Sequence, residues 1–298
     1  MANINIQNCP ACSSTNHQKV MTAEDYLVSN ESFEIMECND CSLRFTSPIP
    51  TDNKISNYYE SDDYISHTGK GNSVINQIYR IVQYFTLWSK KKKVINFSQM
   101  RSGSILDIGC GTGKFLKTMK QSGWEIDGVE INETARRVAE NNTGSAILNQ
   151  ADFLNSKKKY DVITLWHSLE HLYDLNKYLN RISTSLNANG VIMIAVPNYQ
   201  SFDAEYYKQD WAAYDVPRHL YHFSMKAINK LMEKYNFKLI QSKQLPFDPF
   251  YVSLLSELSV REKHNILKAL LVGWKSYWLG QKDTEKGSSI LYVFKKKQ

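Results

Sequence analysis

The sequence predicts an α/β fold, a doubly wound and mostly parallel sheet preceded by a small cysteine-stapled unit. Three observations predict it. From Ser104 onward, short apolar runs alternate with amphipathic helices, which is typical of a parallel sheet with helices on both faces. The first of these runs leads into a glycine-rich loop, and two Cys-x-x-Cys pairs lie near the start of the chain. The length of 298 residues fits one large domain with appendages, or two domains.

The composition excludes several other classes of protein. Apolar residues make up 42% of the chain and charged residues 22%, as in ordinary globular proteins, and 13 Gly and 7 Pro exclude collagen-like and linker-like chains. No apolar run approaches the roughly 18 residues that a membrane span requires. The N-terminus lacks the charged start and apolar core of a secretory signal, so we expect a cytoplasmic protein. The net charge of +6 is spread too diffusely for a nucleic-acid partner.

The first unit, residues 1–50, is predicted to fold around a metal ion. Each Cys-x-x-Cys pair forms a tight turn that aims two thiolates at one ion, and residues 33–38 alternate like a strand entering the second turn. Four sulfur ligands satisfy tetrahedral zinc with no open position, so the site should be structural. A unit of this size cannot bury enough apolar surface to fold without such a staple. The expected ligands are Cys9, Cys12, Cys38 and Cys41.

Residues 51–100 are interpreted as a helical linker or cap. Large apolar residues recur there at helical spacing, and this stripe is predicted to pack on the following domain. Its members are Ile75, Ile78, Tyr79, Val82, Phe85 and Trp88. The basic run at 90–93 is interpreted as solvated surface at the end of an element.

The remaining residues, 101–298, carry the alternating pattern of the sheet. Six strands are expected, at 104–108, 125–130, 160–166, 190–196, 237–242 and 289–295. Helices are expected at 114–122, 133–141 and 176–186. A mostly helical insertion at 246–286 has the apolar spacing of amphipathic helices. It can form a lid over an apolar ligand, form a dimer surface or simply pack against the sheet. The sequence therefore allows both a monomer and a homodimer.

The strongest motif is the loop at 106–114, where an apolar strand runs into Gly109, Gly111 and Gly113 and then into a helix. Glycines let the backbone approach a ligand closely, and the helix N-terminus offers free N–H groups. The third glycine comes one residue too early for the dinucleotide fingerprint, and the chain has no phosphate-binding loop of the Walker type. A pyrophosphate site is therefore disfavoured.

Two further elements indicate a nucleoside ligand. Glu130 ends the next strand, where a carboxylate can accept hydrogen bonds from two ribose hydroxyls. Asp152 and Phe153 lie in a predicted short loop, in which the Asp can bond an exocyclic amine and the ring can cover a purine face. Each element alone is weak, but their order and spacing after the glycine loop favour a nucleoside-binding α/β domain.

These motifs resemble the successive motifs of class I S-adenosylmethionine-dependent methyltransferases over about residues 100–245. The resemblance implies a seven-stranded sheet whose last strand is antiparallel, with S-adenosylmethionine above the first two strands. It implies that the three glycines cradle the methionine part and that Asp107 lies near its amino group. It also implies that Glu130 holds the ribose and that Asp152 with Phe153 holds the adenine.

The chain also resembles narrower groups of methyltransferases. A zinc unit before such a domain resembles sugar C-methyltransferases that act on nucleotide-linked deoxysugars. Residues 166–172 resemble ubiquinone-type O-methyltransferases, some of which bind a divalent metal at E-x-x-E-H. Here His167 takes the first position, and we expect Glu170 and His171 to fix the loop by hydrogen bonds, while a second metal there stays open. A zinc-ribbon RNA methyltransferase and a non-catalytic nucleoside-binding module are the alternative functions.

A second polar and aromatic cluster, residues 211–224, follows the strand expected at 190–196, at the edge where ligands bind in parallel sheets. The expected acceptor is a small molecule, either a sugar nucleotide, a quinone-like compound or another hydroxylated or apolar metabolite. A hydroxyl acceptor needs a base. Three histidines are candidates: His219, His167 and His222. Arg218 can hold a carboxylate or phosphate of the acceptor, or pair with Asp215 and leave His219 to face the acceptor.

Overall fold

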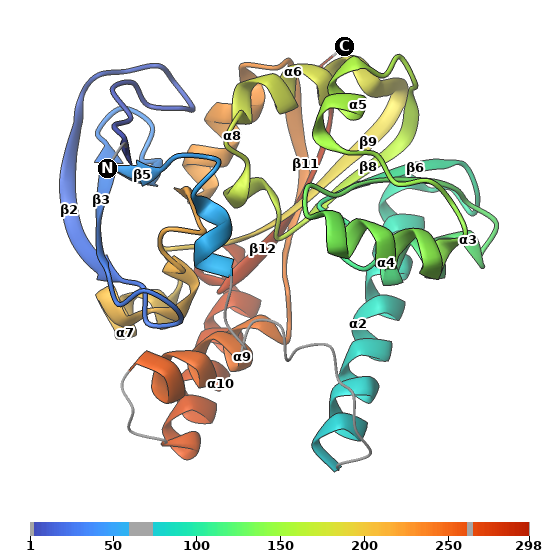
Figure 1. Cartoon of the computed structure of the whole chain (residues 1–298). Helices are drawn as coiled ribbons and strands as arrows, with labels where there is room; N and C mark the ends of the chain where they lie inside the picture. Colours follow the sequence, from blue (N-terminus) through green and yellow to red (C-terminus); the bar gives the residue numbers. More distant parts are fainter. Residues whose placement is uncertain (1–2, 60–73, 261–264, 298) are drawn as a thin grey trace.

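The apolar runs in the second half of the chain form the central sheet. The computed structural model describes residues 3–59, 74–260 and 265–297, of which 74–84 and 259–260 are described as backbone only. Six strands form this sheet within those ranges: β6 (Ser104–Ile108), β7 (Glu125–Val129), β8 (Tyr160–Trp166), β9 (Leu186–Pro197), β11 (Phe237–Gln244) and β12 (Ser289–Lys296). Their order is β11-β12-β9-β8-β6-β7 (Figure 1).

The strand directions confirm the predicted fold class. Strands β7, β6, β8 and β9 are parallel to one another, and β12 is antiparallel to both of its neighbours. The described sheet has one strand fewer than the seven expected. Beside β7, where a seventh strand would lie, the described residues form an isolated β-bridge between Val129 and Leu148. The Leu148 N–H donates to Gly128 O at 2.8 Å, and Asn149 then caps the next helix at once, so the segment turns away before it extends into a strand.

The two faces of the sheet carry different helices, because alternate side chains of a strand point to opposite sides. Leu106 and Ile163 belong to one core, which α5, α6 and α8 share with the N-terminal unit, whereas Ile105 and Val162 belong to another, which α2, α3 and α4 share. These helices are α2 (Val74–Ser98), α3 (Lys114–Lys120), α4 (Glu133–Thr143), α5 (Gln150–Asn155), α6 (Leu175–Ser185) and α8 (Met225–Glu233).

The expected linker at 51–100 contains a short 3-10 helix, η1 (Ile55–Tyr59), and the long helix α2. Residues 60–73 lie outside the described residues, as do the side chains of Ile75, Ile78, Tyr79 and Val82. At the described end of the predicted stripe, Phe85 and Trp88 are 52% and 51% exposed, so these two side chains do not pack into the core. The contact with the sheet is made further along, where Val94 is fully buried.

The N-terminal unit shares a sheet with the chain segment that follows β9. Its strands are β1 (Asn3–Ile4), β2 (His17–Glu24), β3 (Ser32–Cys38), β4 (Arg44–Thr46) and β5 (Ile49–Pro50). Strand β4 pairs with β10 (Tyr221–His222), which places Tyr221 opposite Phe45. Backbone hydrogen bonds therefore continue from the cysteine unit into residues 211–224, the predicted acceptor loop. Figure 1 shows the two parts side by side.

The insertion is helical, as predicted. It contains α9 (Asp248–Leu255), the π-helical turn η6 (Ser256–Val260), α10 (Ile266–Lys282) and η7 (Thr284–Lys286). Gly273 lets α9 and α10 approach closely, since a Cβ there would lie 2.9 Å from Phe250 Cα. Short helices occur in two loops that follow strands of the sheet. Helix η3 (Leu169–His171) follows β8, and α7 (Phe202–Tyr207), η4 (Lys208–Asp210) and η5 (Ala212–Tyr214) follow β9. Across the ranges described, no helix combines the length and apolarity that crossing a membrane requires.

Arg218 joins the acceptor loop to the N-terminal unit through a buried ion network. Its guanidinium donates to Asp25 Oδ1 at 2.7 Å, to Asp215 Oδ1 at 2.9 Å and to the Tyr58 carbonyl at 2.8 Å. The side chains of Arg218 and Asp25 are 1% and 0% exposed. The expectation that Arg218 binds the acceptor is therefore wrong, because its donors are committed to protein oxygens. The alternative expectation, that it pairs with Asp215, agrees with the structure.

Replacing Asp25 by Ala should destabilise the fold strongly, because it removes one partner of a buried guanidinium. We expect a loss of about 3–5 kcal/mol in the free energy of unfolding, measured by urea denaturation. The matched control is Glu34→Ala, which removes an exposed pair with Lys19 whose two side chains are each 47% exposed and should cost about 1 kcal/mol or less. Equal losses in the two variants would contradict the structural role assigned to Arg218.

Candidate active site

The glycine loop leaves β6 at the carboxyl edge of the parallel sheet. Gly109, Gly111 and Gly113 all have left-handed backbone, with φ of 74°, 53° and 72°. A Cβ on Gly109 would lie 2.5 Å from the Cβ of Ser168, and one on Gly113 would lie 3.0 Å from Ala139. A Cβ on Gly111 would meet nothing within 4 Å. Gly109 and Gly113 thus serve close packing within the protein, and the backbone at Gly111 is the open part of the loop.

Two acidic side chains flank this loop. Asp107 is 3% exposed and accepts a hydrogen bond from Thr164 Oγ1 at 2.6 Å. Burial raises the pKa of Asp107 to about 7, against the opposing effects of Thr164 and the charge of Lys90. Glu130 is 9% exposed; its Oε2 accepts from the Gly111 N–H at 2.8 Å and its Oε1 from the Asn132 N–H at 2.9 Å. Glu130, which the sequence predicts to bind the ribose, therefore also holds the glycine loop in place.

Lys90 is a site residue that the sequence interpretation missed. It lies on α2, and its Nζ is 4.8 Å from the centre of the Trp166 ring. Burial lowers its pKa, while the charges of Asp107 and Asp248 oppose that shift. The interpretation of residues 90–93 as solvated surface is therefore wrong for Lys90. No pattern in the run of four lysines distinguishes Lys90 from its neighbours, because the contacts come from distant parts of the chain.

Residues 151–153 lie in the helix α5 and not in the expected loop. Asn149 caps this helix by accepting from the Asp152 N–H at 2.9 Å. The cap turns Phe153 toward the sheet, where its ring is 0% exposed and lies 5.7 Å from that of Tyr178. Phe153 is thus a core residue, and the expectation that its ring covers the adenine is wrong. Asp152 is exposed.

His167 lies directly after β8 with a left-handed backbone, φ 54°. Its Nε2 is 3.0 Å from Asp248 Oδ2, and its Nδ1 is 3.6 Å from Glu170 Oε1. Burial alone would lower the pKa of His167, but the carboxylates of Asp248 and Glu170 raise it to about 10. The ring is therefore a cation at neutral pH, and its expected role as a base is wrong.

His222 is also unsuited to the role of base. It is 3% exposed, its Nε2 is 3.2 Å from Thr46 Oγ1, and its ring packs against that of Tyr214. Burial, followed by the charges of His219 and Arg44, moves the pKa of His222 well below its ordinary value. The ring stays neutral but lies inside the junction with the N-terminal unit, so this candidate is wrong as well.

His219, His171 and Glu170 form a compact cluster. One ligand atom from each lies within 4.8 Å of the others. His219 Nδ1 is 2.8 Å from the Ala213 carbonyl and His171 Nδ1 is 2.9 Å from the Arg218 carbonyl. Because a carbonyl oxygen only accepts, both Nδ1 atoms carry the proton, and each Nε2 keeps its lone pair.

Glu170 places a buried carboxylate beside these two rings. Its side chain is fully buried, His167 Nδ1 lies 3.6 Å from Oε1, and neither oxygen accepts a hydrogen bond from the residues that the structure describes. Burial opposes ionisation, but the neighbouring His167 and the charges of His219 and His171 lower the pKa of Glu170. The loop that carries Glu170 and His171 also contacts the end of β6, since Ser168 Oγ donates to Ile108 O at 2.7 Å.

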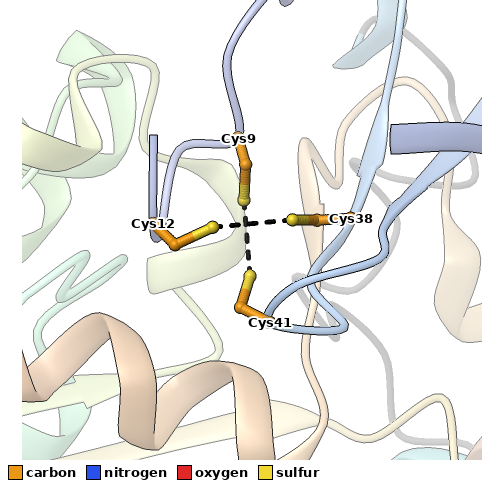
Figure 2. A group of neighbouring side chains, drawn as sticks. All are labelled: Cys9, Cys12, Cys38 and Cys41. Carbon is orange, nitrogen blue, oxygen red and sulfur yellow. Dashed lines mark hydrogen bonds between the residues drawn. The ribbon is translucent and has the colours of Figure 1, made fainter. Parts of the chain in front are cut away.

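The four cysteines of the N-terminal unit point their sulfurs at one centre (Figure 2). The sulfurs of Cys9 and Cys41 are 3.4 Å apart, those of Cys12 and Cys38 are 3.5 Å apart, and none of the four is in a disulfide. Tetrahedral zinc with Zn–S bonds of about 2.3 Å spaces its sulfurs by about 3.8 Å. The donor set therefore fits zinc in number, chemistry and spacing.

The two cysteine turns have the same backbone geometry. The Ser13 N–H donates to Cys9 O and the Ser42 N–H donates to Cys38 O, both at 2.8 Å. Ser13 and Ser42 have φ of 65° and 61°. The hydrogen bond between the two thiols lowers the pKa of Cys9 and raises the pKa of Cys41, so Cys9 is the thiol of this pair that loses its proton first.

Comparison with known proteins agrees with this geometry. The family model described as a methyltransferase domain matches residues 79–242, more than half of the chain, and the chain belongs to this family. The ubiquinone biosynthesis O-methyltransferase of Pelagibacter ubique (strain HTCC1062) is 26% identical over 185 residues, covering 54% of this chain and 74% of that protein. An uncharacterized methyltransferase of Alkaliphilus oremlandii (strain OhILAs) is 30% identical over 114 residues, covering 37% of this chain and about half, 51%, of that protein.

Solved structures share the fold. The magnesium protoporphyrin IX methyltransferase of Synechocystis PCC 6803 with bound SAH has a TM-score of 0.54 and 13% identity, covering 83% of this chain and 100% of that chain. The sequence prediction of a class I enzyme is confirmed: the protein is an S-adenosylmethionine-dependent methyltransferase.

Proposed function

We propose that this enzyme methylates a hydroxyl group of a small molecule and that His219 is the base that removes the hydroxyl proton. The observation that carries the proposal is the tautomer of His219. Its Nδ1–H is held by the Ala213 carbonyl at 2.8 Å, so Nε2 is free to take a proton. Its competitors are less suited, since His167 is a cation and His222 is buried in the junction. The named O-methyltransferase relative supports a hydroxyl acceptor.

The surroundings of His219 suit the cation that forms during the reaction. As the acceptor oxygen attacks the methyl carbon, the C–O bond forms while the C–S bond breaks, and the hydroxyl proton passes to Nε2. Asp215 Oδ2 lies 3.9 Å from Nε2, and the Glu170 carboxylate lies in the same cluster. Two negative charges therefore stabilise the imidazolium, while the main contribution to rate comes from aligning acceptor and methyl group.

The cofactor site is proposed to use the open side of the glycine loop. The backbone at Gly111 would contact the methionine part, with Asp107 near its amino group. Glu130 keeps a second lone pair on each oxygen, so both can accept from ribose hydroxyls while holding the loop. Asp152 is exposed and can meet the adenine amine. Lys90 is the cation beside Asp107 and is proposed to bind the methionine carboxylate.

Two variants separate the proposed cofactor contacts. Glu130→Ala should weaken binding of both S-adenosylmethionine and 5′-methylthioadenosine about ten- to a hundred-fold, because both ligands carry the ribose. Lys90→Ala should weaken S-adenosylmethionine only, because methylthioadenosine lacks the carboxylate. Calorimetry with both ligands measures this. Unchanged affinities for Glu130→Ala, or equal losses for both ligands in Lys90→Ala, would reject the respective role.

We also propose that the four cysteines bind a structural zinc ion that holds the His219 loop. Cys41 is followed closely by β4, where Thr46 Oγ1 donates to the His219 carbonyl at 2.8 Å and the Thr46 N–H donates to Leu220 O at 3.0 Å. Zinc would fix the second cysteine turn and, through it, this strand. The ion has no open position for substrate and takes no part in methyl transfer.

Purified protein should contain about one zinc per chain by elemental analysis. Cys12→Ser should lose the zinc and most of the methyl transfer while keeping affinity for S-adenosylmethionine, because the glycine loop lies outside the N-terminal unit. Cys110→Ser is the control for zinc content, since Cys110 is remote from the cluster in sequence and outside its four ligands. A disulfide between Cys9 and Cys12, or metal-free protein after purification without chelator, would contradict the assignment.

A second candidate role for the cluster is the binding of a divalent cation by Glu170, His171 and His219. The specific observation in its favour is Glu170, whose buried oxygens have no hydrogen-bond partner within the described ranges. In this arrangement both Nε2 lone pairs and the carboxylate are ligands, and the carbonyls at the two Nδ1 atoms orient the rings. Such an ion would lower the pKa of an acceptor hydroxyl that reached it.

His219→Ala should lower methyl transfer from labelled S-adenosylmethionine into a cell extract by about a hundred-fold or more, with cofactor affinity unchanged. Turnover close to that of the unaltered enzyme would rule out His219 as base. Activity lost on chelation and restored by Mg²⁺ or Mn²⁺, with cation binding abolished in Glu170→Gln, would assign the cluster to the metal role.

A further inference from the structure

Helix α10 exposes large apolar side chains on the face that points away from the protein. They are Ile266, Leu267, Leu270, Leu271, Trp274 and Trp278, which are between 44% and 69% exposed. A different set on the same helix is buried against the protein: Ala269, Val272, Gly273, Ser276 and Gly280. A helix of a globular protein normally keeps one apolar face and turns a polar face outward. This helix is apolar on both, and its buried face consists of the smaller residues.

The exposed residues form one continuous stripe with a basic flank. At about 100° per residue, the six side chains span about 140° of the helix circumference, and Lys268, Lys275 and Lys282 follow within about the next 60°. No acidic residue occurs in α10. Lys282 Nζ lies 3.5 Å from the centre of the Trp278 ring. Of the acidic residues nearby, Glu257 is buried and pairs with Lys268, and Asp248 pairs with His167.

Two further large apolar side chains are exposed on other segments. Phe247, which precedes α9, is 49% exposed, and Trp88 of α2 is 51% exposed, with Lys92 Nζ 5.0 Å from its ring centre. Figure 1 shows α10 and α2 projecting from the same end of the molecule, beyond the sheet. Helices that lie in a membrane interface typically combine an apolar face that contains tryptophan with lysines on the adjoining polar face, as α10 does.

We propose that α10 docks this end of the enzyme on a bilayer surface that carries acidic headgroups. The apolar stripe would enter the headgroup region, and the flanking lysines would contact the lipid phosphates and carboxylates. A second copy of the chain fits less well, because pairing two α10 faces would bring basic flanks together without acidic partners. The helix is about 26 Å long at 1.5 Å per residue, and it would lie along the surface, since no described helix can cross a membrane.

The docking surface adjoins the active site. Asp248 begins α9, the helix that packs on α10, and its carboxylate contacts His167 at 3.0 Å. Resting on the function proposed above, this arrangement places the acceptor side of the site beside the lipid, so that an apolar acceptor dissolved in the bilayer can reach the enzyme without crossing water. Vesicle binding itself needs no methyl transfer, so the two proposals fail separately.

The test uses the full chain and sedimentation with vesicles of phosphatidylcholine alone or mixed equally with phosphatidylglycerol. We expect at least about ten-fold tighter binding to the mixed vesicles, reduced by salt, and a blue shift of tryptophan fluorescence. The triple variant Leu267→Gln, Leu271→Gln, Trp274→Gln should bind at least about ten-fold more weakly and keep its affinity for S-adenosylmethionine. Lys275→Gln with Lys282→Gln should lose the preference for phosphatidylglycerol.

The control variant carries Ile4→Gln, Leu27→Gln and Ile240→Gln, three other exposed apolar positions that are 42%, 39% and 49% exposed. It should bind vesicles like the unaltered protein. Absence of binding to either vesicle, or equal losses in the control and the α10 variant, would overturn the proposal. A dimer in light scattering that the α10 variant dissociates would also overturn it, by showing that a second copy covers this face.

Discussion

The guanidinium of Arg218 connects the parts of the structure on which the active site depends. It lies between Asp25 of the N-terminal unit and Asp215 of the acceptor loop, where all three side chains are wholly or largely removed from water. A buried charge of this kind is costly unless every donor has a partner, so the network tolerates only one arrangement of the loop. The carbonyl of the same residue orients His171, and His219 follows directly in sequence.

The histidines around this network show how environment assigns different states to one residue type. His167, held between two carboxylates, is a cation; His222, buried beside Thr46, is neutral. His219 and His171 are oriented by carbonyls at Nδ1, so each keeps the Nε2 lone pair, and both rings lie in one cluster with the buried Glu170 carboxylate. The carbonyls and carboxylates around each ring thus set its protonation state and tautomer. These states cannot be predicted from the positions of the histidines in the sequence.

The fold and the contact between the glycine loop and Glu130 could be predicted because they depend on local sequence. Alternating apolar runs predict strands, and the spacing of glycines and of Glu130 depends on one strand-loop-helix unit and its neighbour. The cysteine cluster was predictable because zinc demands a fixed spacing. Phe153 was misassigned because one residue, Asn149, starts a helix where a loop was expected. The surroundings of Lys90 and the pairing of Arg218 with Asp25 could not be predicted, because these contacts join distant positions in the sequence; Arg218 and Asp25 are 193 residues apart.

The close approach of Gly109 to Ser168 connects the glycine loop after β6 with the loop after β8. In the proposed function, one loop binds the methyl donor and the other carries the Glu170–His171 pair on the acceptor side. With 2.5 Å between the position of a Cβ on Gly109 and the Ser168 Cβ, and a hydrogen bond from Ser168 to Ile108, neither loop can shift alone. A side chain at the first glycine of the motif would therefore push the two loops apart, and with them the proposed donor and acceptor sites.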